Sequence, residues 1–265
     1  MIDKYDTLKI EIRNRAMLIE LARPQSRHSL NEHLVRDLAA ALRAADEDCT
    51  AVILTASGPV FCSGADLSAF PPVEITNCEN SSEAAQKISS LVDDRYNDVI
   101  RAMRSCRRPV IAALNGHAVG GGVGLALSAD ALLMAHGATI QLPFVPKLGL
   151  VPDMGAMWFL ARAMGAAAAA RLCLTGAKVD AEEASRLGIA WAHHAQSELL
   201  AAALSLAGQF AGIETALLQA FRNQTAGLFD RTLDDQLRLE ASQQGALAAQ
   251  PRFLERIADF RRTAA

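Results

Sequence analysis

Two stretches of the chain repeat the same succession of a short apolar run, a glycine-bearing turn and a helix-forming segment. The first covers residues 51–70, where AVILT leads into SGPVFCSGADL, and the second covers residues 109–129, where PVIAALNG leads into HAVGGGVG. A short continuous run of apolar and β-branched residues is typical of a buried strand. Strand, glycine turn and helix occurring twice indicate an α/β layered fold.

The composition agrees with such layers. Of the 265 residues, 51% are hydrophobic and only 5% are aromatic. This length suffices for one large domain, or for one domain with a small appendage, and its apolar content excludes a disordered chain. Because aromatic residues are scarce, we expect closely spaced helices and thin strands rather than an aromatic-rich β-sandwich.

Charge and cysteine usage exclude several classes of protein. The net charge of −3 lacks the basic excess of a nucleic-acid-binding domain. Five cysteines, an odd number with no C-x-x-C pair, predict reduced thiols in a cytoplasmic protein. The polar, alternating start MIDKYDTLKI does not resemble a signal peptide. The longest apolar stretch, 118–135, contains a glycine cluster and Asp130, so we expect no membrane span.

Further elements follow from periodicity. Apolar and polar residues alternate on both sides of Asn14-Arg15, which predicts an antiparallel hairpin over 8–21. Asn31 is placed to cap a helix that carries a leucine at every fourth position. ALLMA, 131–135, predicts a third buried strand.

Residues 71–90 are polar and begin with two prolines, so we expect a surface loop or mobile flap there, followed by a helix from about 91 to 104. From residue 197 every segment has a helical pattern, and the expected helices are 197–211, 214–225, 232–247 and 251–262. The change from mixed α/β to all-helical sequence predicts two domains, 1–195 and 196–265.

The two glycine turns are the most informative feature for function. Each places a backbone N–H at or near the start of a helix, where donors lack intrahelical partners. Two such N–H groups that converge would form an oxyanion hole, in which each donor contributes roughly 3–4 kcal/mol to a transition state. The alternative is that the glycines only allow tight turns and close helix packing.

Other motif-based functions lack support. After Gly120 and Gly122, a dinucleotide-binding fingerprint needs a third glycine, and Leu125 stands there. No Gly-Lys-Ser/Thr follows, as a phosphate-binding loop requires, and there is no G-x-S-x-G of a serine hydrolase. The histidines do not pair with carboxylates at zinc-ligand spacing, so we expect no metal site.

Four blocks of the chain, in this order and spacing, resemble the crotonase, or enoyl-CoA hydratase/isomerase, superfamily. They are AVILTASGPVFCSGADL, RRPVIAALNGHAVGGGVGLALSAD, LGLVPDMGAMWFLARAMG and LTGAKVDAEEASRLGIA. The resemblance implies a spiral of ββα units followed by an all-helical C-terminal domain that assembles trimers, often dimers of trimers. It also implies an acyl-CoA thioester substrate, with no cofactor beyond the coenzyme A that the substrate carries.

The resemblance further assigns roles to single residues. The backbone N–H groups of Ala65 and Gly121 would hold the thioester oxygen as it becomes an enolate. Residues expected to contact the substrate are Gly64, Asp66, Leu67, Gly120, Gly122, Gly124, Val145, Tyr96 and Arg27. Asp66 is alternatively expected to cap the following helix, and Arg23 shares with Arg27 the family's basic character near coenzyme A.

The sequence departs from the family's hydratases at two positions. Hydratases carry a glutamate shortly after the glycine triplet, where this chain has Gly124, and a second one where it has Val145, or Phe144 if the alignment slips by one. A glutamate pair that activates water is the core of hydration. Its absence favours another reaction of the superfamily.

Asp153 is the candidate acid/base. Isomerases of the superfamily carry an aspartate here, and one carboxylate can move a proton between two carbons if burial raises its pKa toward neutrality. Segments 95–101 and 232–240 resemble the ring-epoxide isomerases of phenylacetyl-CoA degradation. The alternative is that Asp153 only caps a helix over 154–164.

The sequence therefore predicts an enzyme that moves a double bond in an enoyl-CoA through an enolate. The alternatives are other crotonase chemistry (hydration, thioester hydrolysis or decarboxylation) or a homologue that binds acyl-CoA without turning it over.

Overall fold

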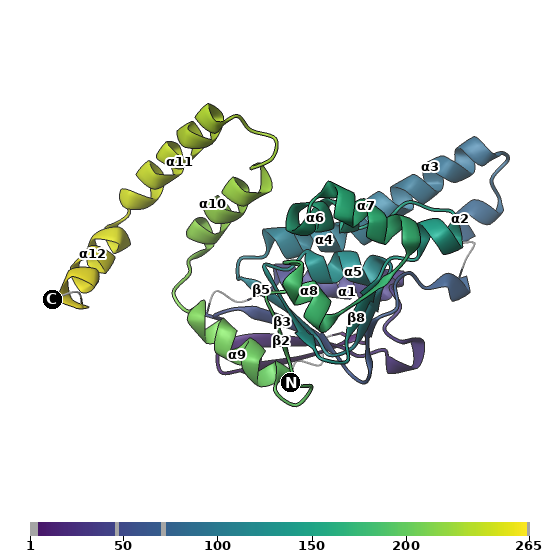
Figure 1. Ribbon diagram of the computed structural model, residues 1–265, viewed down its shortest axis with the longest axis horizontal. Coiled ribbons are helices and arrows are strands. Elements are labelled where there is room, and N and C mark those ends of the chain that lie inside the picture. The colour runs from purple at the N-terminus through teal and green to yellow at the C-terminus, as the bar shows by residue number, and fades with distance from the viewer. Residues whose placement is uncertain (1–4, 46–47, 70–72, 264–265) are drawn as a thin grey trace. The chain divides into compact units, whose positions relative to one another are not determined.

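The structure of the chain is a computed structural model that describes residues 5–45, 48–69 and 73–263 (Figure 1). Contacts divide the chain into two compact units, one ending at Gly212 and the other beginning at Ile213. The larger unit combines two sheets with helices, which confirms the predicted α/β class.

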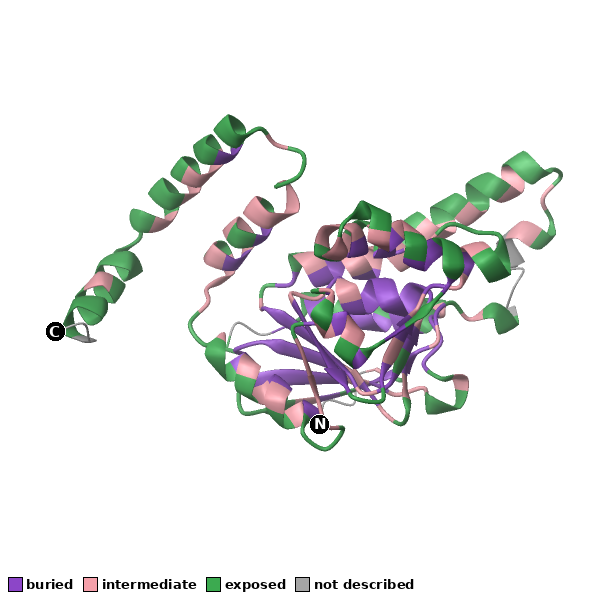
Figure 2. Cartoon of the chain, viewed as in Figure 1, coloured by how far each residue is buried: buried purple, intermediate pink, exposed green. Residues whose placement is uncertain are grey.

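The main sheet has six strands in the order β1-β2-β3-β5-β7-β10. The strands are β1 Leu8–Arg13, β2 Ala16–Leu21, β3 Val52–Ala56, β5 Val110–Leu114, β7 Ala131–Ala135 and β10 Ala192–His194. β1 and β2 form the predicted antiparallel hairpin, and the remaining neighbours pair in parallel. Every residue of β5 and β7 is buried, as their continuous apolar runs predict (Figure 2).

A second sheet of four short strands has the order β4-β6-β8-β9. Its strands are β4 Val60–Cys62, β6 His117–Val119, β8 Thr139–Gln141 and β9 Lys178–Asp180. In each of the pairs β3–β4, β5–β6 and β7–β8, the first strand belongs to the main sheet and the second to the small sheet, and a helical segment follows. This succession is the expected spiral of ββα units. The sequence predicts glycine turns where β4 and β6, the first two of these short strands, lie.

Helices cover the main sheet. Those of the larger unit are α1 Glu32–Arg43, α2 Val73–Thr76, α3 Ser81–Leu91, α4 Asn97–Ser105, α5 Gly121–Leu127, α6 Ala156–Met164, α7 Ala166–Thr175, α8 Ala181–Arg186 and α9 Leu199–Gln209. The side chain of Asn31 accepts a hydrogen bond from the Leu34 N–H (2.9 Å), so the predicted N-cap of α1 is confirmed. Two π-helical turns, Val92–Tyr96 and Phe144–Leu148, interrupt the regular pattern.

The prediction of a loop over 71–90 is wrong for most of this segment, because 73–76 and 81–91 are helical. Residues 71–72 lie outside the described residues. Asn80 caps α3 by accepting from the Glu83 N–H (3.0 Å), and Glu83 pairs with Lys87 at 2.8 Å. α3 buries none of its residues, so it shows no apolar period, and local capping and charge pairing define it instead.

The division into units differs from the expected boundary at 195/196. The sequence predicts that α9 belongs to the C-terminal domain, but its residues Leu199, Ala203 and Ala207 are buried in the core of the larger unit. In Figure 1, α9 lies below the strands of the main sheet and α5 above them. Packing against the sheet therefore keeps α9 with the larger unit, which continues to Gly212.

The smaller unit contains the three remaining helices, α10 Thr215–Ala226, α11 Leu233–Ala248 and α12 Pro251–Thr263, close to their predicted bounds. Glu214 joins α10 to α12 through Arg252 (2.8 Å) and Arg256 (3.3 Å). Within the described residues, no helix has the length and apolar character needed to cross a membrane.

Candidate active site

The two glycine turns meet, as the sequence predicts. Gly64 has a φ of +86°, and a Cβ atom built on it would lie 2.8 Å from the Val119 carbonyl oxygen and 3.5 Å from the Gly121 nitrogen. No side chain larger than hydrogen fits between the turns at this point. The close approach brings the peptides of Ala65 and Gly121 into one small region of the fold.

Ala65 presents an N–H group from which no described residue accepts a hydrogen bond. Segment 63–66 runs beside 27–30 as a parallel bridge, in which Leu30 N–H donates to the Gly64 carbonyl (2.8 Å) and Asp66 N–H donates to the Leu30 carbonyl (3.0 Å). Because backbone groups alternate along an extended segment, the Ala65 N–H is directed away from Leu30. It has no acceptor in the described part of the chain.

Gly121 supplies the second donor. It is the first residue of α5, and its N–H likewise has no acceptor among the described residues. The preceding Gly120 (φ +57°, ψ −126°) donates its own N–H to the Gln141 carbonyl at 2.9 Å, so it contributes to the sheet. These dihedral angles are accessible only to glycine, which therefore sets the direction of the Gly121 peptide.

The Asp153 carboxyl group lies beside Gly121. A Cβ atom built on Gly121 would be 3.5 Å from Asp153 Oδ1 and 2.7 Å from Met154 Sδ. Oδ1 is buried and has no hydrogen-bond partner among the described residues. Burial raises the pKa of this carboxyl to about 6, against a smaller opposing effect of its own backbone N–H.

The alternative role of Asp153, as a helix cap, is wrong. α6 begins at Ala156, its cap residue is Gly155, and no side chain makes a capping hydrogen bond there. Met154 adopts a left-handed conformation (φ +49°) that delays the start of the helix. As a result the Asp153 side chain is directed to Gly121 instead of to the N–H groups of α6.

Two of the glycines expected to contact substrate leave no room for a side chain. A Cβ atom on Gly122 would lie 2.7 Å from the Cys62 carbonyl oxygen, and one on Gly124 would lie 2.6 Å from the Met154 carbonyl oxygen. The same contact explains the missing glutamate at position 124, because Met154 fills the space that a side chain would need. At the other hydratase position, the ring of Phe144 lies 3.5 Å from a Cβ built on Gly120, and Val145 is half-buried.

Three other expected substrate residues lie around this region. The Tyr96 hydroxyl donates to the Leu30 carbonyl (3.4 Å), and its pKa is raised by burial and, to smaller extents, by Asp66 and Asp153 among nearby charges. Leu67 is 58% exposed just after the Ala65 turn. Arg27 is exposed, and its carbonyl accepts from the Ser63 N–H at 3.1 Å, which places it at the edge of the same turn.

The Asp66 side chain makes its hydrogen bonds within the protein. Its oxygens accept hydrogen bonds from Ser29, from Ser68 and from the guanidinium of Arg23, the other basic residue expected near coenzyme A. These hydrogen bonds, that of Ser68 above all, hold the pKa of Asp66 below its usual value. Asp66 caps only the short 3₁₀ turn Leu67–Ala69 that follows it.

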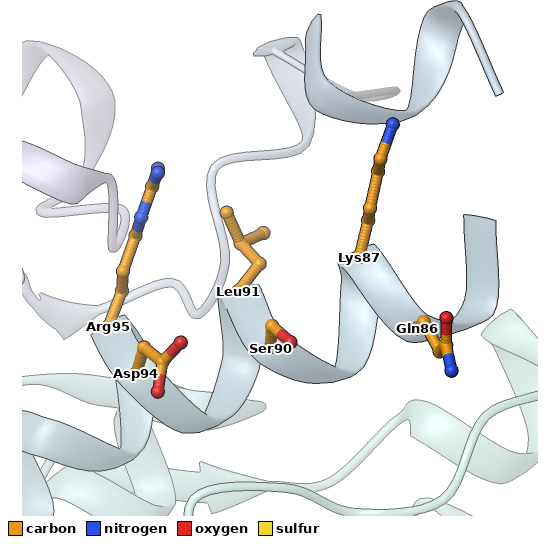
Figure 3. A pocket seen from close by; sticks show the side chains of 6 residues that line it. All are labelled: Gln86, Lys87, Ser90, Leu91, Asp94 and Arg95. Atoms are coloured by element: carbon orange, nitrogen blue, oxygen red, sulfur yellow. The ribbon is translucent and has the colours of Figure 1, made fainter. Parts of the chain in front are cut away.

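A cavity of about 670 Å³ lies within residues 68–100, the segment that we expect from the family resemblance to shape the pocket. Figure 3 shows its lining on α3 and the adjoining π-helical turn, with Lys87, Leu91 and Arg95 projecting from one side of the helix. The remaining lining residues are Gln86, Ser90 and Asp94. The lining residues recur at intervals of four in the sequence, as 86, 90 and 94 and as 87, 91 and 95. This spacing places the residues of each series on one face of a helix.

Burial of Asp153 should make stability depend on pH. The folded chain keeps this carboxyl protonated up to a pH of about 6, whereas the unfolded chain loses the proton near 3.8. The unfolded state then binds fewer protons, so the free energy of unfolding falls as pH rises through this window, by up to about 3 kcal/mol. Urea unfolding of wild type and Asp153→Asn should therefore give curves that diverge between pH 4 and pH 8, with the variant gaining relative stability at higher pH. Curves that remain parallel would show that Asp153 titrates normally.

Comparison with known proteins identifies the family. A family model described as enoyl-CoA hydratase/isomerase matches residues 11–262. A protein of Rhodobacter capsulatus named probable enoyl-CoA hydratase is 33% identical over 264 residues, which cover 97% of this chain and 95% of that protein. The 1,2-epoxyphenylacetyl-CoA isomerase of Escherichia coli is also 33% identical, with 92% and 88% covered.

Solved structures agree with this assignment. The crystal structure of an enoyl-CoA hydratase from Polaromonas superposes with a TM-score of 0.83 at 27% identity, covering 96% of each chain. The match of the family model spans nearly the whole sequence, and the convergent glycine turns lie within it. The chain therefore belongs to the enoyl-CoA hydratase/isomerase family of acyl-CoA-processing enzymes.

Proposed function

We propose that this enzyme isomerises an enoyl-CoA, with Asp153 transferring the proton and the N–H groups of Ala65 and Gly121 stabilising the enolate. The observation that carries the proposal is the buried, unpartnered oxygen of Asp153 beside Gly121. A carboxyl with a pKa of about 6 is present in both protonation states near neutral pH, as a group that both removes and returns a proton requires.

The reaction needs no group beyond these and the substrate. The Asp153 carboxylate removes a proton from the α-carbon of a 3-enoyl thioester, and the electron pair of that C–H bond forms a double bond to the carbonyl carbon. The displaced electrons reach the thioester oxygen, where the two N–H groups donate hydrogen bonds to the developing negative charge. Asp153 then returns the proton to the γ-carbon at the other end of the dienolate, and the oxygen electrons restore the carbonyl, so atoms and charge balance without a cofactor. The same steps run in reverse from the conjugated isomer.

Packing at the hydratase positions supports isomerisation over hydration. Addition of water needs a second group to activate the water molecule, and the family's hydratases use two glutamates. Here Gly124 is closed by Met154, and the other position offers only the apolar side chains of Phe144 and Val145. The names of similar proteins include both probable hydratases and a 1,2-epoxyphenylacetyl-CoA isomerase.

Product analysis tests the proposal. In deuterated water the enzyme should convert 3-hexenoyl-CoA into 2-hexenoyl-CoA and incorporate solvent deuterium into its carbon chain. Starting from 2-hexenoyl-CoA, it should exchange deuterium while forming little 3-hydroxyhexanoyl-CoA. Mass spectrometry and NMR distinguish the products. A 3-hydroxyacyl thioester as the main product, or free coenzyme A, would replace isomerisation by hydration or hydrolysis.

We also propose that the enzyme assembles through its C-terminal unit into a homotrimer or a dimer of trimers. Helices α11 and α12 expose several large apolar side chains, which a second copy would cover; those most exposed are Leu233, Leu254 and Phe260. Light scattering should give three or six times the chain mass of 28.2 kDa. A monomeric mass at micromolar concentration would contradict the proposal.

A further inference from the structure

Asp66, the residue directly after Ala65, has all of its hydrogen-bonding capacity engaged by the protein. Its Oδ1 accepts from the Ser68 N–H (3.2 Å) and from the Ser68 hydroxyl (2.6 Å). Its Oδ2 accepts from the Ser29 hydroxyl (2.9 Å) and from the Arg23 guanidinium (3.4 Å). The side chain is only 16% exposed, so this is a nearly buried charge with four donors around it.

The segment that binds Asp66 is held in an unusual backbone conformation. Arg27 (φ +52°) and His28 (φ +53°) are consecutive left-handed residues, a conformation that persists only where the surroundings fix it. The Arg23 N–H donates to His28 Nδ1 (3.1 Å), and the opposite ring nitrogen donates to the Ser57 carbonyl (2.9 Å). Burial lowers the pKa of His28, in keeping with the neutral ring that this pattern requires.

These contacts fix the Ala65 peptide from both ends. Before Ala65, the Gly64 carbonyl accepts from the Leu30 N–H, and after it the Asp66 N–H donates to the Leu30 carbonyl. The Asp66 carboxylate adds a second attachment on the downstream side, to Ser29, while Arg23 also donates to the Ser29 carbonyl. A substitution of the Asp66 carboxylate would therefore change the direction in which the Ala65 N–H points.

We propose that Asp66 is a positioning residue: together with Arg23 and Ser29 it aims the Ala65 N–H at the thioester oxygen and contacts no substrate itself. The inference rests on the proposed function, since it presupposes that Ala65 N–H binds this oxygen. It is an alternative to the substrate contact that the resemblance implies for Asp66.

Asp66→Asn tests the proposal with little change in volume. The amide nitrogen of asparagine would replace one of the two carboxylate oxygens. Because that nitrogen is a donor, it would face either the donors of Arg23 and Ser29 or the N–H of Ser68, and the hydrogen bonds on that side would be lost. A misplacement of about 1 Å at a reacting group can cost 10²-fold in rate. We expect kcat to fall by about 10- to 100-fold and KM to change much less, because the N–H stabilises the negatively charged enolate oxygen more than the neutral carbonyl.

The chain offers a matched control in Asp130. Its carboxylate also accepts from a backbone N–H (Val110, 2.8 Å) and from an arginine (Arg104, 3.4 Å), and its side chain is 17% exposed. Asp130→Asn should therefore disturb the fold to a similar degree, which thermal unfolding measures. It should leave kcat at the wild-type value.

Infrared spectroscopy separates positioning from a purely structural role. Hexanoyl-CoA labelled with ¹³C at its thioester carbonyl should show a lower C=O stretching frequency on the wild-type enzyme than in water, because both N–H groups donate to it. On Asp66→Asn the band should move back toward the value in water, while on Asp130→Asn it should stay at the wild-type position.

A wild-type band in Asp66→Asn, with wild-type kcat, would overturn the role of Asp66 and leave the proposed function intact. If the wild-type enzyme itself shows no shift, the donor role of Ala65 and Gly121 fails, and the positioning role fails with it. Should Asp66→Asn not fold, Ser29→Ala removes a single donor and is measured in the same way, with a smaller shift of the band expected. An unchanged band in that folded variant would equally overturn the proposal.

Discussion

Replacing Asp153 with asparagine should lower kcat for double-bond migration by about 10²- to 10⁴-fold while acyl-CoA still binds, since general acid–base help is of this size. Asparagine occupies the same space beside Gly121 but cannot accept a proton. In the wild type kcat/KM should rise with pH and level off above a midpoint near 6, because the carboxylate is the active form for proton removal. The residual activity of the variant should lack this midpoint.

Two measurements make the result for Asp153 specific. Isothermal titration with hexanoyl-CoA should give similar dissociation constants for wild type and variant, which excludes a collapsed site. Exchange of solvent deuterium into the substrate should be lost together with isomerisation, because both require the same proton transfer. Isomerisation at the wild-type rate in Asp153→Asn would remove Asp153 from the mechanism.

Gly64→Ala should have the second large effect, a fall in kcat/KM of about 10²-fold or more. The new Cβ atom would lie 2.8 Å from the Val119 carbonyl oxygen, in a residue whose φ of +86° already disfavours alanine. Relief of this contact must move the two glycine turns apart, and with them the N–H groups of Ala65 and Gly121. Steady-state kinetics with 3-hexenoyl-CoA measures the effect.

Gly58→Ala is the matched control for this substitution. Gly58 has a similar φ of +71°, but a Cβ atom built there meets nothing within 4 Å. Both variants should lose stability through backbone strain, on the order of 1 kcal/mol, and only Gly64→Ala should also lose activity. Equal losses of activity in the two variants would mean that the spacing between the turns is unimportant.

The parts of the fold that the sequence predicts are those whose pattern is set locally or by complete burial. β5 and β7 are apolar throughout because both faces are covered, and Asn31 caps α1 through a contact only three residues long. Strands of three residues such as β4 and β6 carry too few positions for a period to emerge. α3, which buries no residue, lacks the apolar face on which helix prediction depends.

In the candidate site, too, some features could be predicted from the local sequence and others could not. The glycine turns were visible because glycine is needed wherever the backbone approaches another backbone closely. The packing of Gly124 against Met154 was not visible, because the two residues come together only in the folded chain. Likewise, the sequence around Asp66 does not indicate that Arg23 and Ser29, about 40 residues earlier, donate hydrogen bonds to its carboxylate.

The contact between Gly124 and Met154 constrains how an enzyme of this kind can change in evolution. A glutamate cannot enter position 124 unless the segment containing Met154 moves, and that segment also carries Asp153. The first substitution on a path toward two-glutamate chemistry would therefore displace the proposed acid/base before any replacement is in place. The effect of a glutamate at position 124 thus depends on whether Asp153 is still needed. Variants that carry only one of the required substitutions should be poor at both isomerisation and hydration.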